Sequence, residues 1–315
     1  MAEKNKLVLN KPSFGKRLKQ DMRRNWSLYL LVLPVIIFFI IFHYWPLWGV
    51  QIAFRDFIPR KGIMNSPWVG FDHFKRFLTG VQAPRVIRNT IVISLLDLAF
   101  GFPAPIILAL LMNELRNDTF KRSVQTITYL PHFISLVVVT GMIKDFVGTY
   151  GIVNDIRMFF GAEERIPMLT RPELFRPIYI ISGIWQNVGW GSIIYLAALS
   201  GIDQELYEAA AIDGAGRWQQ TLHVTFPGIA PTIIIMLILR VGKIMNVGYE
   251  KIILLYSQGT YETADVISTY VYRMGLLNMD LSFSAAVGLF NSVISFILVM
   301  ITNAISRRVS EISLW

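Results

Sequence analysis

The sequence predicts an all-α, polytopic membrane protein with six transmembrane helices, on the evidence of its composition and of its long apolar runs. Of the 315 residues, 54% are hydrophobic and only 16% are charged, whereas soluble domains carry roughly 25% charged residues. So few charges cannot cover the surface of two soluble domains, and a chain this hydrophobic is not disordered. Residues 26–45 form a run of 20 residues without Asp, Glu, Lys or Arg, enough to cross a hydrocarbon core of about 30 Å.

The first predicted transmembrane helix, 26–45, follows a basic tail at 1–25. Residues 1–24 contain eight Lys or Arg and two acidic residues. A basic segment before an apolar run is also typical of a signal peptide, but this run is too long for a signal-peptide core and ends in His-Tyr-Trp-Pro instead of small residues. Tryptophan and tyrosine at both ends suit the membrane interfaces. We therefore expect a retained helix.

Five further apolar segments complete the six predicted helices. The middle segments contain Pro, Gly, Asn, Gln or charged residues, which is typical of helices that face protein or a cavity rather than lipid. The two halves of the chain show no repeat, so the inverted-repeat architecture of many secondary transporters is not favoured. The five segments are roughly 89–112, 124–147, 178–200, 228–247 and 283–305.

Basic residues predict the orientation of these helices. Six spans place both termini on one side, and the basic tail indicates the cytoplasmic side of the cell (inner or plasma) membrane. Lys121 and Arg122 after the second span and Arg307 and Arg308 after the sixth support this orientation, although residues 46–88 also carry seven Lys or Arg. The expected extracellular segments are 46–88, 148–177 and 248–282, and the expected cytoplasmic segments are 201–227 and the tail 307–315.

Several kinds of chemistry are excluded or disfavoured. The chain has no cysteine, which excludes disulfides, thiol nucleophiles and Cys-ligated metals and leaves the redox compartment undetermined. The four histidines show no metal-ligand spacing, so no metal site is expected. No G-x-x-x-x-G-K-S/T phosphate loop, no G-x-S-x-G motif and no paired intramembrane aspartates are present. Topology and anionic lipid headgroups explain the net charge of +9 better than nucleic acid does.

The cytoplasmic loop between the fourth and fifth spans has its own predicted structure. Asp203 can cap a helix that contains the alanines at 209–211, and Gly214 and Gly216 break this helix. A second helix over 217–224 is expected to end before the next proline. The small residues leave a shallow surface that a partner can approach closely. The alternative is that the loop is only an amphipathic connector.

The same loop resembles the EAA loop in permease subunits of binding-protein-dependent ABC importers. The family pattern is EAA, three residues, G, nine residues and I-x-L-P. Here Glu208, Ala209 and Ala210 are followed at the same spacings by Gly214 and by Val-Thr-Phe-Pro at 224–227. The resemblance implies a coupling helix that docks on a cytoplasmic ATPase, with Glu208 providing a polar contact. The implied ATPase-coupling residues are Glu208, Ala209, Ala210, Asp213, Gly214, Ala215 and Pro227.

Further segments, among them IAFRDF and SPWVGFDHF, resemble the carbohydrate-uptake permeases of these type I importers. They are most similar to the subgroup for oligosaccharides of complex plant polysaccharides, such as acidic pectic fragments. The resemblance covers most of the chain after residue 30 and implies that 85–306 is an ABC transporter type-1 transmembrane domain. It also implies three protein partners, which are a second homologous permease in a heterodimer, two copies of an ATPase that binds ATP and Mg, and an extracellular solute-binding protein.

Two other classes of function remain as alternatives to a transport subunit. A polytopic membrane enzyme requires convergent catalytic residues, and none is found in this sequence. An ATP-independent carrier requires no coupling loop. The chain itself is therefore expected to be neither an enzyme nor a holder of cofactors.

Aromatic and amide side chains in the last three spans are candidates for contact with the sugar. Aromatic faces pack on the C–H surfaces of sugars, and amides hydrogen-bond to hydroxyl groups. The alternative for the fourth span is a packing seam of Gly183, Asn187 and Gly191, with the tryptophans facing lipid. Small residues around Asn291 are likewise typical of helix packing. The candidates are Trp185, Gln186, Asn187, Trp190, Asn246, Tyr249 and Asn291.

Arg240 and Lys243 stand in or near the outer half of the fifth span. Charges at membrane depth are costly and therefore indicate function. If the cargo is an acidic oligosaccharide, these cations can pair with its uronate carboxylates. The alternative, which we favour, is that these cations form a structural ion pair with Asp97 or Glu250, or extend their side chains to the membrane interface.

Overall fold

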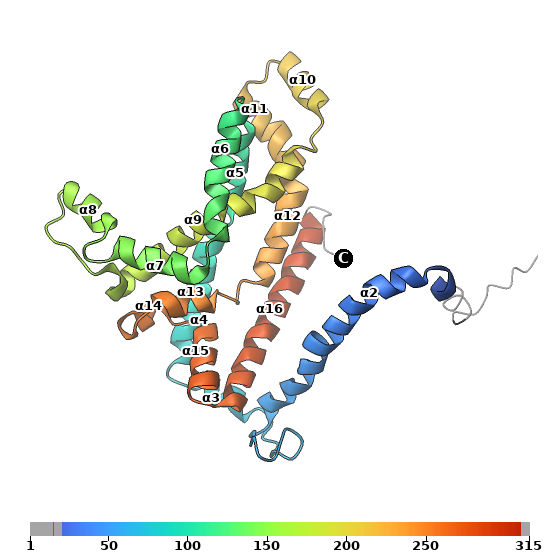
Figure 1. Ribbon diagram of the computed structural model, residues 1–315, viewed down its shortest axis with the longest axis vertical. Coiled ribbons are helices and arrows are strands. Elements are labelled where there is room, and N and C mark those ends of the chain that lie inside the picture. The colour runs from blue at the N-terminus through green and yellow to red at the C-terminus, as the bar shows by residue number, and fades with distance from the viewer. Residues whose placement is uncertain (1–14, 16–20, 310–315) are drawn as a thin grey trace, which may run out of the picture.

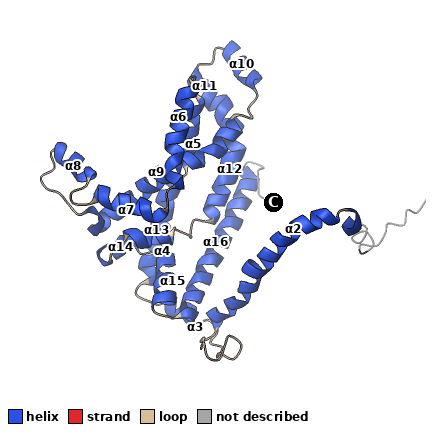
Figure 2. Cartoon of the chain, viewed as in Figure 1, coloured by secondary structure: helices blue, strands red, loops and turns tan. Residues whose placement is uncertain are grey.

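The protein is almost entirely helical in the computed structural model, which describes residue 15 and residues 21–309 (Figure 1, Figure 2). Most of the predicted basic tail and the last six residues lie outside this part of the chain. The α-helices are α2 (Trp26–Phe39), α3 (Asp72–Leu78), α4 (Ala83–Leu96), α5 (Pro103–Asn113), α6 (Asp118–Tyr129), α7 (Leu136–Val147), α8 (Ile152–Phe159), α9 (Pro172–Leu199), α10 (Gln204–Ile212), α11 (Arg217–Gln220), α12 (Phe226–Gly242), α13 (Tyr249–Leu255), α14 (Tyr261–Ala264), α15 (Ile267–Tyr272) and α16 (Leu281–Val309).

Five helical stretches among the described residues are long and apolar enough to cross a membrane. A sixth long helix, α9, has 28 residues and therefore extends about 42 Å at 1.5 Å per residue. It is less apolar because its middle contains Ser182, Gln186 and Asn187. The predicted all-α membrane fold is confirmed, and α9 is consistent with the predicted fourth span. The five apolar stretches are Trp26–Phe54, Ala83–Asn113, Leu136–Phe159, Arg217–Gly242 and Leu281–Arg308.

Among the prolines inside continuous helical stretches, Pro46, Pro103 and Pro227 each follow a π-helical turn. In each case the residue before the proline donates its N–H to the carbonyl five residues earlier. In a regular α-helix the proline ring would clash with a carbonyl of the preceding turn. The wider π-turn moves this carbonyl away from the ring. The turns and prolines are η1 (Ile40–Tyr44) before Pro46, η3 (Asp97–Gly101) before Pro103 and η6 (Thr221–Thr225) before Pro227.

These turns correct two predicted helix ends. The first helix does not stop at Trp45 but continues through η2 (Trp45–Phe54). The second helix of the loop does not end before Pro227, because α11, η6 and α12 form one stretch from Arg217 to Gly242. In both cases the π-turn relieves the steric clash by which the following proline would otherwise end the helix.

The third predicted span, 124–147, is wrong as one continuous helix. α6 is followed by a 3-10 turn, η4 (Leu130–Phe133), and the backbone then becomes extended at Ile134 and Ser135. The Ser135 hydroxyl caps α7 by accepting a hydrogen bond from the Val138 N–H at 3.4 Å. A proline at the start of the turn and a serine at its end therefore divide the segment.

α9 is the central helix of the bundle and packs against α5, α6 and α12. A side chain at Gly189 would bring Cβ to 2.1 Å from the Thr128 carbonyl oxygen, so the close approach of α6 and α9 requires glycine there. By contrast, α2 contains no buried residue. In Figure 1 it stands apart from the other helices until η2, which packs on α16.

Candidate functional site

The loop with the EAA pattern forms the end of the molecule where α10 is labelled in Figure 1. Asp203 caps α10 as predicted, because its side chain accepts a hydrogen bond from the Glu205 N–H at 3.0 Å. The Ala215 N–H donates to the Ala210 carbonyl at 2.9 Å, which is the 6→1 bond of a Schellman motif. Gly214 has a φ of +80°, a conformation that glycine adopts without strain. The helix end is therefore built into the local sequence.

This loop is held in place while its outer face stays open. The Tyr207 hydroxyl lies 3.0 Å from the Thr225 hydroxyl and ties α10 to η6. No residue of α10 is buried, and the side chains of Ile212 and Trp218 are 87% and 77% exposed. Exposed apolar groups on a rigid surface are typical of a protein contact site. Glu208 and its neighbours in the EAA pattern are thus placed together on an accessible helix.

A second candidate site is a cavity of about 460 Å³ beside the middle of α9. Three cations and one carboxylate line it, together with amide and aromatic side chains. Since it has a single carboxylate and no histidine, this lining suits an anion rather than a metal ion. The lining residues are Ser94, Asp97, Leu98, Gly101, Pro105, Tyr179, Gly183, Ile184, Asn187, Val188, Trp190, Gly191, Arg240, Lys243, Ile244, Asn246, Val247, Gly248 and Lys251.

Arg240 forms an ion pair with Asp97, which is the structural partner that the sequence analysis favoured. The pair joins the end of α12 to η3, and both side chains remain partly exposed to the cavity. At Gly101 a Cβ would approach the Asp97 carboxylate to 2.6 Å, so this glycine leaves room for the acid. Arg240 is therefore compensated locally, whereas Lys243, the first residue beyond α12, is exposed.

Lys251 of α13 is a cavity residue that sequence reasoning missed. Its side chain is buried, its amine donates to the Tyr179 carbonyl at 3.1 Å, and Nζ lies 5.0 Å from the centre of the Tyr179 ring. Burial lowers the pKa of Lys251 to about 8, while the charge of Asp97 acts in the opposite direction. The sequence analysis places Lys251 in the expected extracellular segment 248–282, where a lysine gives no sign of a cavity. The apolar Ile-Ile-Leu-Leu run after Lys251 was the available signal for a buried helix.

The structure separates the four candidates of the fourth span. Asn187 and Trp190 line the cavity, but Trp185 and Gln186 do not. The His132 ring stacks on Trp190 with centroids 4.7 Å apart, and its Nδ1 lies 3.1 Å from Oδ1 of Asn187. His132 from η4 thus orients both cavity residues of α9. The predicted glycine seam at 183 and 191 also faces this cavity.

The remaining candidates lie at the end of α12, at the start of α13 and in α16. Asn246, Tyr249 and Asn291 line a second cavity of about 420 Å³. The buried Asn291 amide donates to the Met245 carbonyl at 3.2 Å and to Oδ1 of Asn246 at 3.0 Å. These bonds tie α16 to the segment after α12. Asn291 therefore joins two parts of the bundle and also lines this cavity, and its contact with the sugar stays a prediction.

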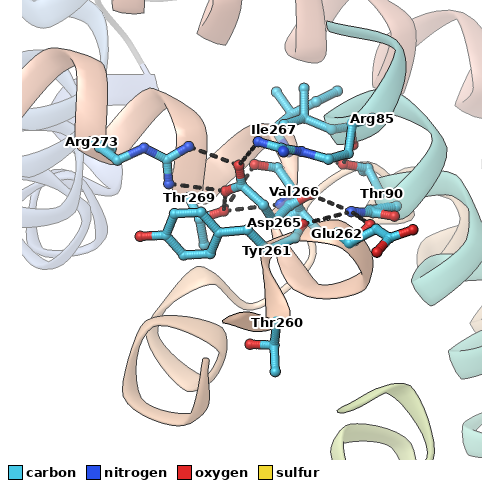
Figure 3. A network of polar contacts seen from close by, with 12 residues as sticks. Arg85, Thr90, Thr260, Tyr261, Glu262, Asp265, Val266, Ile267, Thr269 and Arg273 are labelled. Carbon is cyan, nitrogen blue, oxygen red and sulfur yellow. Dashed lines mark hydrogen bonds and ion pairs between the residues drawn. The ribbon is translucent and has the colours of Figure 1, made fainter. Parts of the chain in front are cut away.

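A separate cluster of charges surrounds Asp265, between α14 and α15 (Figure 3). The Asp265 side chain is fully buried, and Arg273 donates to its two oxygens at 2.7 and 3.1 Å. The Thr269 hydroxyl donates to the same carboxylate at 2.8 Å, and Arg85 of α4 lies 3.5 Å away. The Asn89 amide donates to the Asp265 carbonyl at 2.9 Å. This cluster fastens α14 and α15 to α4.

The chain belongs to the family described as binding-protein-dependent transport system inner membrane component, whose family model matches residues 101–311. Membership confirms the predicted class of protein, a membrane-spanning transport subunit and not an enzyme. The family match does not test the expected limits of the transmembrane domain, 85–306, which stay a prediction.

Two relatives and two solved structures resemble the chain over nearly its whole length. Protein LplB of Bacillus subtilis (strain 168) is 44% identical over 291 residues, which cover 92% of this chain and 91% of LplB. The polygalacturonan/rhamnogalacturonan transport system permease protein YteP of the same strain is 43% identical over 305 residues, 96% of this chain and 95% of YteP.

The first solved structure is a bacterial ABC transporter involved in the import of the acidic polysaccharide alginate. Its matching chain is 47% identical with a TM-score of 0.86, and the match covers 93% of this chain and 99% of that chain. The second is the bacterial alginate ABC transporter in complex with alginate pentasaccharide-bound periplasmic protein. It is 46% identical with a TM-score of 0.87, covering 95% and 100% of the two chains.

Proposed function

We propose that this chain forms one half of the translocation pore of an ATP-driven importer for acidic oligosaccharides. The observation that carries the proposal is the cationic cavity beside α9. Its cations suit uronate carboxylates, while Trp190 and Asn187 offer an aromatic face and an amide for the sugar ring. YteP is a permease for polygalacturonan and rhamnogalacturonan, and the similar solved structure imports the acidic polysaccharide alginate, which supports the same class of cargo.

In this proposal α10 is the coupling helix that docks on a cytoplasmic ATPase. Glu208 and Asp213 provide polar contacts, and Ala209, Ala210 and Ala215 allow close approach. Gly214 ends the helix, and Pro227 stands in the first turn of α12. The ATPase, in two copies, binds ATP and Mg and performs the hydrolysis.

The route from this loop to the cavity is a single helical stretch. Residues Arg217–Gly242 form one helical stretch that leads away from the end beside α10 (Figure 1). Arg240 and Lys243 at its other end line the cavity. Arg240 lies in the last turn of this stretch, and Lys243 follows it directly. A push by the ATPase on α10 is therefore expected to move the cationic wall of the cavity. A continuous helix transmits such a displacement better than two helices joined by a flexible break.

The remaining partners follow from this arrangement. A second homologous permease, in a heterodimer, supplies the other half of the pore, and membrane lipids surround both. The α10 end and both termini lie in the cytoplasm. Residues 46–88, which include α3, therefore face the extracellular solute-binding protein that delivers the oligosaccharide. The transmembrane domain of the ABC transporter type 1 then spans 85–306. The alginate transporter crystallised with its periplasmic protein supports this organisation.

Co-purification of the ATPase tests the docking surface. Glu208→Arg reverses a charge on the exposed face of α10, and Gly214→Val strains the left-handed turn at its end. Both variants are expected to lower the amount of ATPase recovered with the permease complex. Glu163→Arg makes the same charge change on an exposed residue between α8 and α9 and should have no effect. Wild-type recovery in both loop variants would show that the docking assignment is wrong.

A further inference from the structure

The cavity beside α9 contains a buried ammonium group without a carboxylate partner. The side chain of Lys251 is 7% exposed, and its only hydrogen bond among the described residues is to the Tyr179 carbonyl at 3.1 Å. The face of the Tyr179 ring lies 5.0 Å from Nζ. In the described part of the chain, no Asp or Glu oxygen lies within 4.0 Å of this amine. The two contacts offset only part of the cost of burying the charge.

The other two cations of the cavity are in a different situation. Arg240 is paired with Asp97, so its charge is already compensated. Lys243 is exposed, so its ammonium group remains hydrated. Lys251 is therefore the cation of this site that gains most from an incoming anion, because a buried charge is screened least and is stabilised most by a counter-ion.

The tip of Lys251 is reached from the cavity past Gly183. A Cβ at Gly183 would lie 3.4 Å from Nζ, and both residues line the cavity. A longer side chain at this position of α9 would cover the amine. The missing side chain thus leaves the ammonium group open to a ligand that occupies the cavity.

We propose that Lys251 binds a carboxylate of the cargo and is the residue by which the permease distinguishes acidic from neutral oligosaccharides. The inference rests on the proposed function in sugar import and deepens it, because it moves charge recognition from Arg240 to Lys251. Asp97 holds Arg240 in the wall of the cavity, and Lys251 on α13 supplies the unpaired charge. Asn187 and Trp190 on the adjacent α9 then contact the neutral part of the sugar.

The test is import by the complete transporter, with its binding protein and ATPase, in proteoliposomes. The two probes are a galacturonate trisaccharide and the same trisaccharide with methyl-esterified carboxyl groups. For each probe, the rate of a variant is divided by the wild-type rate, so that selection by the binding protein cancels. Lys251→Gln should reduce import of the acid about tenfold, the loss expected for one charge-assisted hydrogen bond, and change import of the ester less than about twofold. Lys251→Arg, which keeps the charge, should restore import of the acid.

A second variant tests the same point without changing a charge. Gly183→Leu should cover the amine and reduce import of the acid more than that of the ester, while the binding protein still stimulates ATP hydrolysis. Lys144→Gln, at an exposed lysine in the last turn of α7, is the matched control and should behave as wild type. Equal losses for both probes in Lys251→Gln, or no loss, would overturn the inference. If the wild-type complex imports neither sugar, the proposed function itself is wrong.

Discussion

The Asp265 cluster and the cavity beside α9 both contain three or more charged side chains, but they compensate these charges differently. Asp265 is fully buried and receives hydrogen bonds from Arg273 and Thr269, with Arg85 close by. In the cavity one carboxylate, Asp97, faces three cations, and the buried one of these, Lys251, is not paired with it. In the first cluster the buried charge, Asp265, has donors within the protein on its carboxylate, whereas in the second the buried charge, Lys251, has no carboxylate partner among the described residues and faces the cavity.

Pairing, more than burial, distinguishes a structural charge from a ligand-binding charge in this protein. A buried carboxylate with several donors is satisfied within the protein and fastens helices together. A buried ammonium group that faces a cavity with only a carbonyl and a ring as neighbours is satisfied fully only when an anion arrives. Substitutions of single residues in the two regions test this distinction.

The largest effect is expected for Asp265→Asn. This change leaves Arg273 and Arg85 without their carboxylate, and breaking a buried ion pair costs about 3–5 kcal/mol of folding free energy. Unfolding of the purified protein in detergent should therefore shift strongly to lower denaturant concentration. Asp280→Asn is the control, since its pair with Arg76 at 2.8 Å is partly exposed and is worth about 1 kcal/mol or less. Similar losses in both variants would contradict the proposed role of burial.

A smaller effect of opposite sign is expected for Lys251→Met. The pKa of Lys251 in the folded protein is about 8, below its ordinary value of 10.5, so the folded state disfavours the charged form. At pH 7 the variant should be more stable than wild type by the order of 1–3 kcal/mol, since one pKa unit corresponds to about 1.4 kcal/mol. Between pH 8 and 10.5 only the unfolded wild type keeps the proton, so wild-type stability should rise and the difference should shrink. A pH-independent difference in unfolding experiments would refute this.

The smallest effect is expected for the Arg240 and Asp97 pair. Both side chains are partly exposed to the cavity, and ion pairs of this kind contribute roughly 0.2–1 kcal/mol. A double-mutant cycle with Arg240→Gln and Asp97→Asn should show a coupling energy in this range, with the double variant less destabilised than the sum of the two single variants. A coupling energy as large as the loss in Asp265→Asn would show that the cavity pair is a structural lock like the Asp265 cluster.

Local features of the loop were predictable because they depend on neighbouring residues. The cap by Asp203 and the helix end at Gly214 both follow from side-chain or backbone preferences within a few positions. The break of 124–147 at Pro131 and Ser135 had the same kind of local signal, which was outweighed by the length of the apolar run. The continuity of helices past Pro46 and Pro227 was not predictable from proline alone, because a preceding π-turn changes the effect of the ring.

The sequence by itself determined that this protein is a helical membrane permease, because apolar run length and the spacing of the EAA pattern are read along the chain. Only the tertiary structure decided which charges belong to one another. Asp97, Arg240 and Lys251 are separated along the chain by up to 154 positions, and whether a charge is paired depends on distances of a few ångströms between helices. For that reason Arg240, which stood out in the sequence, proves to be paired with Asp97, and the inconspicuous Lys251 is the cation left open to a ligand.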